Sequence, residues 1–165
     1  MKQSNRSKVT SFMVMEVMAA ANKIEQAGTP ISHLEVGQPF SGAPKNAIKN
    51  FSKRLLNSSE NLGYTDSLGI KELRQAIANL YKRWYGISLE PKRVIVTQGS
   101  STAFQLAFLS LFDVGDRVLL GNPSYPCYKN ILSALNLRVI EVDTKIENRF
   151  QLEPNDITTS NAQGL

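Results

Sequence analysis

The residues of this chain with the clearest chemical potential are Gly99, Ser100 and Ser101, at the junction between a predicted strand and a predicted helix. Glycine tolerates positive φ, so the backbone can turn sharply there. The first N–H groups of a helix have no partner within it, and together with the helix dipole they favour a bound phosphate. Serine is also a good N-cap, so the spacing alone leaves phosphate binding and simple helix capping both open.

A second candidate segment is the aromatic loop NPSYPCY, residues 122–128, which follows the next predicted strand. If the two strands are parallel, this loop and Gly99 lie at the same carboxyl edge of the sheet, where ligands of open α/β folds collect. Tyr125 or Tyr128 could stack on a flat ring there, or could simply close the core. The residues leave these two interpretations open.

Other reactive residue types lack the partners that their chemistry needs. Cys127 has no base partner in sequence, so a small buried hydrophobe is the favoured interpretation. His33 has no second His, Cys or Asp beside it, which favours a structural role. The chain contains no GxGxxG, GxxxxGK[ST], HExxH or CxxC pattern. The motifs that usually indicate dinucleotide, nucleoside triphosphate and zinc sites are therefore missing from the sequence.

The elements that must position these residues follow from hydrophobic periodicity and turn signals. Strands are predicted over residues 31–36, 94–97, 117–121 and 138–142, and helices over 9–27, 46–56, 70–85, 101–112 and 125–136. Alternation of strands and helices after residue 94 implies a largely parallel sheet covered on two faces. The helix at 101–112 is apolar almost all round and must be covered on most sides. Residues 145–165 are polar and turn-rich, and their last three read as the start of another element.

Composition excludes several classes of function. The chain has 165 residues, 42% of them hydrophobic, which fits one domain of ordinary size. The net charge of +5 is not gathered into a dense basic block, so no nucleic-acid partner is expected. One cysteine permits no intrachain disulfide and fits a reducing compartment. No apolar run approaches the roughly 20 residues of a membrane span, so we expect no membrane partner and a cytoplasmic location.

Four segments, in the same order as in the family, resemble the class I and II aminotransferases, which are fold-type-I enzymes dependent on pyridoxal 5′-phosphate. They are LEVGQPFSGAP (34–44), LGYTDSLGIKELRQAIA (62–78), VIVTQGSSTAFQLAFLSLFDVGDRVLL (94–120) and NPSYPCY (122–128). The resemblance implies an incomplete three-layer α/β/α large domain with an N-terminal helical arm. Residues 1–45 would form the arm and part of the small domain, and residues 46–165 the N-terminal part of the cofactor-binding large domain.

The resemblance also implies cofactor-binding residues. Gly99 matches the turn glycine, and Ser100 and Ser101 match the residues whose main-chain N–H groups hold the cofactor phosphate. Tyr125 matches the aromatic residue that stacks on the pyridine ring. Tyr64 matches a tyrosine that, in the family homodimer, reaches the cofactor phosphate of the partner subunit.

For the reaction itself, the resemblance implies an amino acid and a 2-oxo acid as substrates, with the backbone of Gly37 lying against the substrate. The family's Schiff-base lysine, the aspartate at the pyridine nitrogen and the carboxylate-binding arginine belong to a part of the fold that would follow Leu165. No lysine of this chain stands in a matching context, so no catalytic residue is expected here. The chain would then be an N-terminal fragment, inactive alone.

The alternative is a non-catalytic remnant or an interaction or dimerisation module. The apolar helix at 101–112 and the methionine-rich first helix favour it, since both need covering. In the family fold the strand at 94–97 pairs with strands from later in the chain. Lacking those neighbours, its backbone groups would go unpaired, and we expect marginal stability or aggregation.

Overall fold

The computed structural model describes residues 2–57, 63–160 and 162, and it divides into two compact units. The first unit comprises Met1–Glu35 and Gln98–Leu165, and the second comprises Val36–Thr97. The interpretation of residues 163–165 as the start of another element falls outside the described residues. The division expected at residue 45 refers to the complete family fold and stays a prediction.

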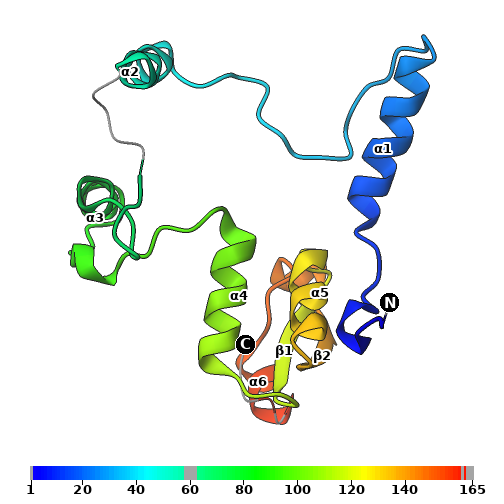
Figure 1. The fold of residues 1–165 in the computed structure, drawn as a ribbon. Coiled ribbons are helices and arrows are strands. Elements are labelled where there is room, and N and C mark those ends of the chain that lie inside the picture. Colours follow the sequence, from blue (N-terminus) through cyan, green and yellow to red (C-terminus); the bar gives the residue numbers. More distant parts are fainter. Residues whose placement is uncertain (1, 58–62, 161, 163–165) are drawn as a thin grey trace. The chain divides into compact units, whose positions relative to one another are not determined.

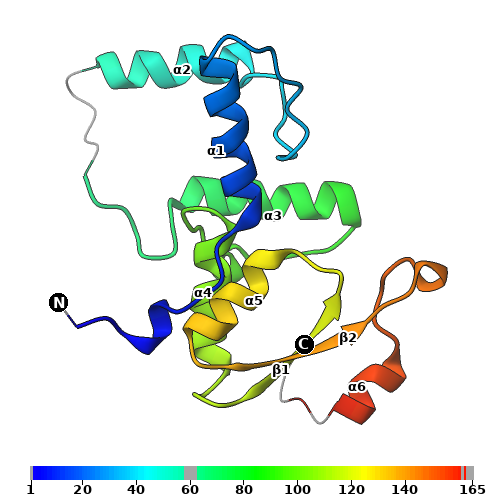
Figure 2. The ribbon, with the colours of Figure 1, turned by 90° about the vertical axis from the view of Figure 1, so that its right-hand side faces the viewer.

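The first unit is built on two parallel strands, β1 (Arg117–Asn122) and β2 (Arg138–Asp143). Helix α5 (Pro126–Ala134) connects them, as the alternation of strand and helix predicts. The register pairs Arg117 with Arg138 and runs in step to the end, where Asn122 meets Asp143. The two strands lie side by side in both views, with α5 close to them (Figure 1, Figure 2).

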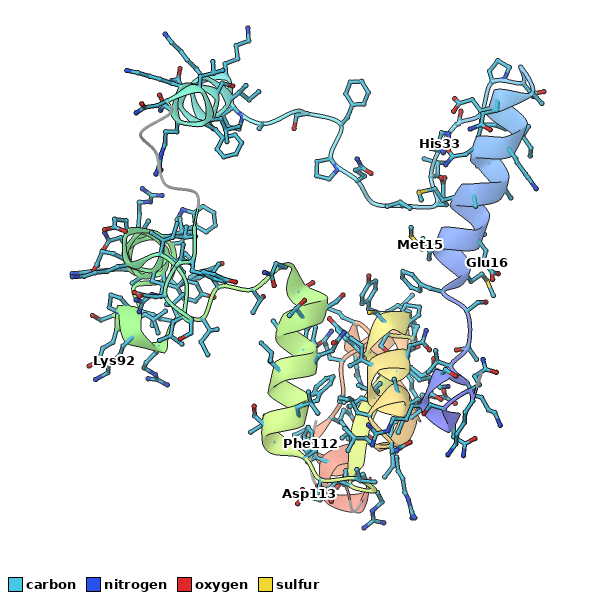
Figure 3. The ribbon with its side chains drawn as sticks, in the orientation of Figure 1. Met15, Glu16, His33, Lys92, Phe112 and Asp113 are labelled. Carbon is cyan, nitrogen blue, oxygen red and sulfur yellow. The ribbon has the colours of Figure 1, made fainter. Side chains whose placement is uncertain are left out.

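The core of this unit lies between the strands and two helices. Val118, Leu132 and Leu137 are buried together, and Phe108 and Phe112 pack against them. Phe108 belongs to helix α4 (Ser100–Leu111), which packs on α5, and Phe112 follows at its C-terminal end beside Asp113 (Figure 3). This packing fixes the start of α4 relative to the loop that precedes α5.

Four further elements belong to the first unit. They are the short 3-10 helices η1 (Asn5–Ser7) and η3 (Ile146–Asn148), helix α1 (Met13–Gln26) and helix α6 (Pro154–Ser160). Helix α1 begins four residues later than the predicted 9–27. Helix α6 lies in a stretch that was predicted to be turn-rich. It begins with proline, which is tolerated in the first turn of a helix, and Asp156 in the same turn is favoured by the positive end of the helix dipole.

The second unit contains helix α2 (Lys45–Leu56), helix α3 (Lys71–Tyr85) and the 3-10 helix η2 (Pro91–Arg93). Helix α3 ends where predicted, because Gly86 adopts the left-handed conformation at φ 69°. The guanidinium of Arg74 donates to the carbonyl of Gly69 at 2.9 Å and to that of Pro91 at 3.4 Å. These contacts join α3 to the segments on either side of it.

Two predicted strands are wrong. Residues 31–36 and 94–97 form no strand, and the only strand pairing among the described residues is that of β1 with β2. The segment at 94–97 is apolar and begins extended, but a strand also needs a hydrogen-bonded neighbour. Its Val96 N–H donates instead to the carbonyl of Leu68 at 3.0 Å. An apolar run such as residues 94–97 predicts an extended chain, but it does not predict whether a partner strand is present.

Candidate functional site

The backbone before helix α4 turns at Gly99, which has φ 82° and ψ 166°. Residues with a Cβ are strained in this conformation, although a Cβ here would meet no atom within 4 Å. Gly99 is also the N-cap and has no side chain to offer the first helical N–H groups. The first turn of α4 carries no acidic residue, so the positive end of its dipole is not neutralised by its own side chains.

The neighbouring loop is anchored at the end of β1. The side chain of Asn122 donates to Asp143 at 2.8 Å, and its carbonyl accepts from both the N–H and the hydroxyl of Thr144. Three residues later Tyr125 is the N-cap of α5, followed by Pro126 in the first turn. The loop is therefore held at both ends.

The structure brings the serine end of α4 and this aromatic loop together through contacts between α4 and α5, and not through a shared sheet edge, since residues 94–97 form no strand. The hydroxyl of Ser101 lies 3.7 Å from the sulfur of Cys127, and the rings of Phe104 and Tyr128 meet at 4.7 Å between centroids. Both are contacts between the first half of α4 and the first turn of α5. Ser100 and Ser101 are exposed, so the N-terminal end of α4 is accessible to a small anion.

Tyr125 and Tyr128 differ in whether the ring closes the core or faces solvent, the two alternatives that the sequence left open. Tyr128 is half-buried, and its ring packs on Phe104, so it helps to close the core. Tyr125 keeps half of its surface exposed, at 50%, and its ring meets that of Tyr128 at 5.4 Å in an edge contact. Of the two, Tyr125 is the ring that remains available to a ligand.

One contact of this loop and one of helix α5 could not be predicted from the sequence. The ring of Phe12 meets Tyr125 edge-on, with centroids 5.8 Å apart and planes at 86°. Asn130 exchanges two hydrogen bonds with Thr10, one to its carbonyl and one from its hydroxyl. The partners are more than a hundred positions apart, and hydrophobic periodicity reports only local structure, so no signal in one sequence identifies them.

A shallow cavity of about 620 Å³ lies beside the loop, between the start of α1 and α5. Its lining combines apolar α1 side chains, Met13, Val14 and Val17, with polar groups from the strand ends and α5. Two of the polar lining residues, Lys129 and Glu141, pair with each other at 2.5 Å. The lysine nearest Tyr125 in sequence is thus already held by a carboxylate.

His33 is held between two carboxylates near the end of α1 (Figure 3). Its Nδ1 lies 2.7 Å from Glu35 and its Nε2 3.5 Å from Glu25. The hydrogen bond with Glu35 raises the pKa of His33 above its ordinary value, and the same bond lowers the pKa of Glu35. These contacts tie the segment after α1 back to that helix, which is a structural role.

The remaining predicted residues, Gly37 and Tyr64, belong to the second unit. Both are exposed, and a Cβ on Gly37 would meet no atom within 4 Å. Their predicted roles toward substrate and partner subunit stay predictions. Within the described ranges no group of three or more His, Cys, Asp or Glu side chains is placed to hold a metal ion. In the same part of the chain, no helix has both the length and the apolarity needed to span a membrane.

Comparison with known proteins supplies the relatives of this chain. The family model for aminotransferase class I and II matches residues 29–163. Valine–pyruvate aminotransferase of Mycobacterium tuberculosis is 45% identical over 146 residues, which are 88% of this chain and 37% of the relative. A (5-formylfuran-3-yl)methyl phosphate transaminase of Methanocaldococcus jannaschii is 41% identical over 84% of this chain and 37% of the relative.

Solved structures give the same result. An aminotransferase from Mycobacterium tuberculosis superposes with a TM-score of 0.89 and 42% identity, over 96% of this chain and 41% of that one. Aspartate aminotransferase from Thermus thermophilus, solved with maleate, has a TM-score of 0.84 and 28% identity over 95% and 40%. This chain thus spans about two fifths of the length of these relatives. The fold is the N-terminal part of fold type I, as the resemblance predicts, and the chain belongs to the class I and II aminotransferases.

Proposed function

We propose that this chain is the part of an aminotransferase that holds the phosphate and one ring face of pyridoxal 5′-phosphate. The observation that carries the proposal is the contact between the start of α4 and the loop after β1, with Ser101 and Cys127 3.7 Å apart. The contact supports the proposal because the helix N-terminus is suited to a phosphate, and Tyr125, two residues before Cys127, keeps an exposed ring. Family membership supplies the identity of the ligand.

In this proposal the backbone N–H groups of Ser100 and Ser101 donate hydrogen bonds to the phosphate, and the dipole of α4 favours its negative charge. The ring of Tyr125 packs on the pyridine ring. When bound, pyridoxal 5′-phosphate supplies the electron-withdrawing ring that allows amino groups to move between amino acids and 2-oxo acids. The geometry fits the cofactor, because Gly99 leaves the helix end uncapped by its own side chain and the serines are exposed.

Further parts of the proposal come from the family alone. Gly37 would lie against an amino acid or 2-oxo acid substrate, and Tyr64 would reach the phosphate bound in the partner subunit of a homodimer. Residues 1–45 would form the arm and part of the small domain, and 46–165 part of the cofactor domain. The proposed location, the cytoplasm, rests instead on the single cysteine of the chain.

We further propose that the 165 residues alone bind the cofactor without transferring amino groups. Catalysis in this family needs a lysine that bonds covalently to the cofactor, and none of the lysines here stands in the corresponding context. Lys129, the nearest to Tyr125 in sequence, is engaged by Glu141.

The experiment is borohydride reduction of the protein with pyridoxal 5′-phosphate, followed by peptide mass spectrometry and a transamination assay. The proposal predicts saturable, phosphate-competed binding, no turnover, and no single lysine that carries most of the pyridoxyl label. Lys129→Ala serves as a control, because its labelling pattern should match that of the original chain apart from position 129. Turnover together with one dominant labelled lysine would show that the account of catalysis is wrong.

A second candidate function, an interaction or dimerisation module, is favoured by the apolar surface of α4. Leu106, Leu109 and Leu111 are 50%, 64% and 71% exposed. Mixing the chain with a full-length relative, followed by size-exclusion chromatography, tests this function directly. A shared elution peak would support it, and a chain that stays monomeric and elutes separately would exclude it.

A further inference from the structure

The segment before helix α1 is fastened to helix α5 by one asparagine. The side-chain amide of Asn130 donates to the carbonyl of Thr10 at 3.1 Å, and its Oδ1 accepts from the Thr10 hydroxyl at 2.9 Å. Two hydrogen bonds between the same pair of residues fix both position and orientation. Asn130 is half-buried, whereas Thr10 is exposed.

Two residues after Thr10, Phe12 makes the contact that this fastening allows. Its ring meets Tyr125 edge-on at 5.8 Å, while Tyr128 meets the same ring at 5.4 Å from within the α5 turn. Tyr128 is in turn packed on Phe104 of α4. Tyr125 is therefore held between a ring from the N-terminal segment and a ring that is fixed to the core.

We propose that Asn130 and Phe12 are positioning residues that hold the Tyr125 ring in one orientation before a planar ligand binds. The role of Tyr125 as the stacking surface rests on the proposed function above. The positioning itself rests on the contacts of Asn130, Thr10 and Phe12. A ring ordered in advance loses less rotamer freedom when the ligand arrives, and this strengthens binding without any new contact.

The first test needs no ligand. The chain is labelled with 3-fluorotyrosine, and the ¹⁹F resonance of Tyr125 is assigned with Tyr125→Phe. Phe12→Leu and Asn130→Ala should each shift or broaden this resonance. Phe150→Leu is the matched control, because Phe150 is 47% exposed and makes no aromatic contact with the described residues. A Tyr125 resonance unchanged in both variants, or moved equally by the control, overturns the proposal.

The second test is titration with pyridoxal 5′-phosphate. Phe12→Leu and Asn130→Ala should weaken binding about two- to tenfold, the range expected for one edge-to-face aromatic contact. Phe12→Tyr keeps the ring edge and should bind within about twofold of the original chain. Affinities equal to the original in both weakened variants would contradict positioning.

The two tests separate the two claims. If the original chain does not bind pyridoxal 5′-phosphate, the proposed function fails, and the ¹⁹F experiment still decides whether Phe12 and Asn130 order Tyr125. If Asn130→Ala fails to fold by circular dichroism, Asn130→Asp replaces it, because it keeps the acceptor for the Thr10 hydroxyl and puts a carboxylate oxygen in place of the donor to the Thr10 carbonyl. A Tyr125 resonance unmoved by Asn130→Asp then counts against the proposal.

Discussion

At the scale of single residues, Gly99 is the position where backbone conformation most directly limits what the site can be. Its φ of 82° and ψ of 166° lie in a region that is essentially reserved for glycine. Because space around a Cβ is open, the requirement comes from backbone strain and not from crowding. A substitution here therefore tests the turn itself.

We predict that Gly99→Ala lowers the free energy of unfolding by about 1–3 kcal/mol, the usual cost of a non-glycine residue in this region. Gly42→Ala is the control, because Gly42 has ordinary φ and open space around its Cβ. Urea denaturation measures both. Equal stability of Gly99→Ala and Gly42→Ala would show that the turn does not depend on glycine.

The contacts of His33 predict a pH dependence. Its pKa is raised, chiefly by the hydrogen bond to Glu35, so the contribution of the charged imidazole is complete below its ordinary pKa and is lost as pH rises through the raised value. The pKa of Glu35 is lowered, so its contribution is present above the ordinary carboxyl value and is lost as pH falls. The pair therefore stabilises the protein most between about pH 4.5 and 6.5.

NMR titration of His33, the one histidine of the chain, checks this directly. Glu35→Gln should lower the pKa of His33 more than Glu25→Gln, because Glu35 is the nearer carboxylate. Glu16→Gln, on the same helix α1 (Figure 3), should leave it unchanged. A His33 pKa unchanged by Glu35→Gln would mean that the pair of His33 and Glu35 does not form in solution.

At the scale of elements, the packing of α5 on the strands positions the site. Leu132 of α5 is fully buried with Val118 and Leu137. Leu132→Ala should cost about 2–5 kcal/mol of unfolding free energy, because it removes transfer energy and leaves a cavity. Leu109→Ala, at a position 64% exposed on α4, should change it by no more than about 0.5 kcal/mol. Chemical denaturation that finds the two variants equal would place the core elsewhere.

Sequence reasoning predicted the elements with strong local signals. Helix α3 and strands β1 and β2 lie within a residue of their predicted bounds, because amphipathic spacing and apolar runs are local properties. The segments at 31–36 and 94–97 carry strand-like residues and form no strand, because pairing depends on a distant neighbour. The sequence predicted that Gly99 and the loop at 122–128 lie close together, but through a strand at 94–97 that does not form. The contacts of Tyr125 with Phe12 and of Asn130 with Thr10 could not be predicted from any local pattern.

At the scale of the whole molecule, the chain leaves much of its apolar surface exposed, including that of α4. Apolar faces of this kind drive association when nothing covers them. We predict concentration-dependent self-association in sedimentation velocity, reduced by Leu106→Gln with Leu109→Gln. Leu55→Gln with Leu56→Gln, on the exposed apolar positions of α2, is the comparison, and a smaller reduction there would assign the association chiefly to α4. A monomer with a sharp, cooperative thermal transition would argue against this and against the marginal stability expected from the sequence.

The central claim is that the start of α4 holds the cofactor through its phosphate, and one comparison of affinities tests it most directly. Equilibrium titration with pyridoxal 5′-phosphate and with pyridoxal isolates the phosphate, because the two ligands share the same ring. We predict that removing the phosphate weakens binding about tenfold or more, as expected for loss of charge-assisted hydrogen bonds. We also predict that Gly99→Ala narrows this difference while Gly42→Ala preserves it. Equal affinity for the two ligands would contradict the account.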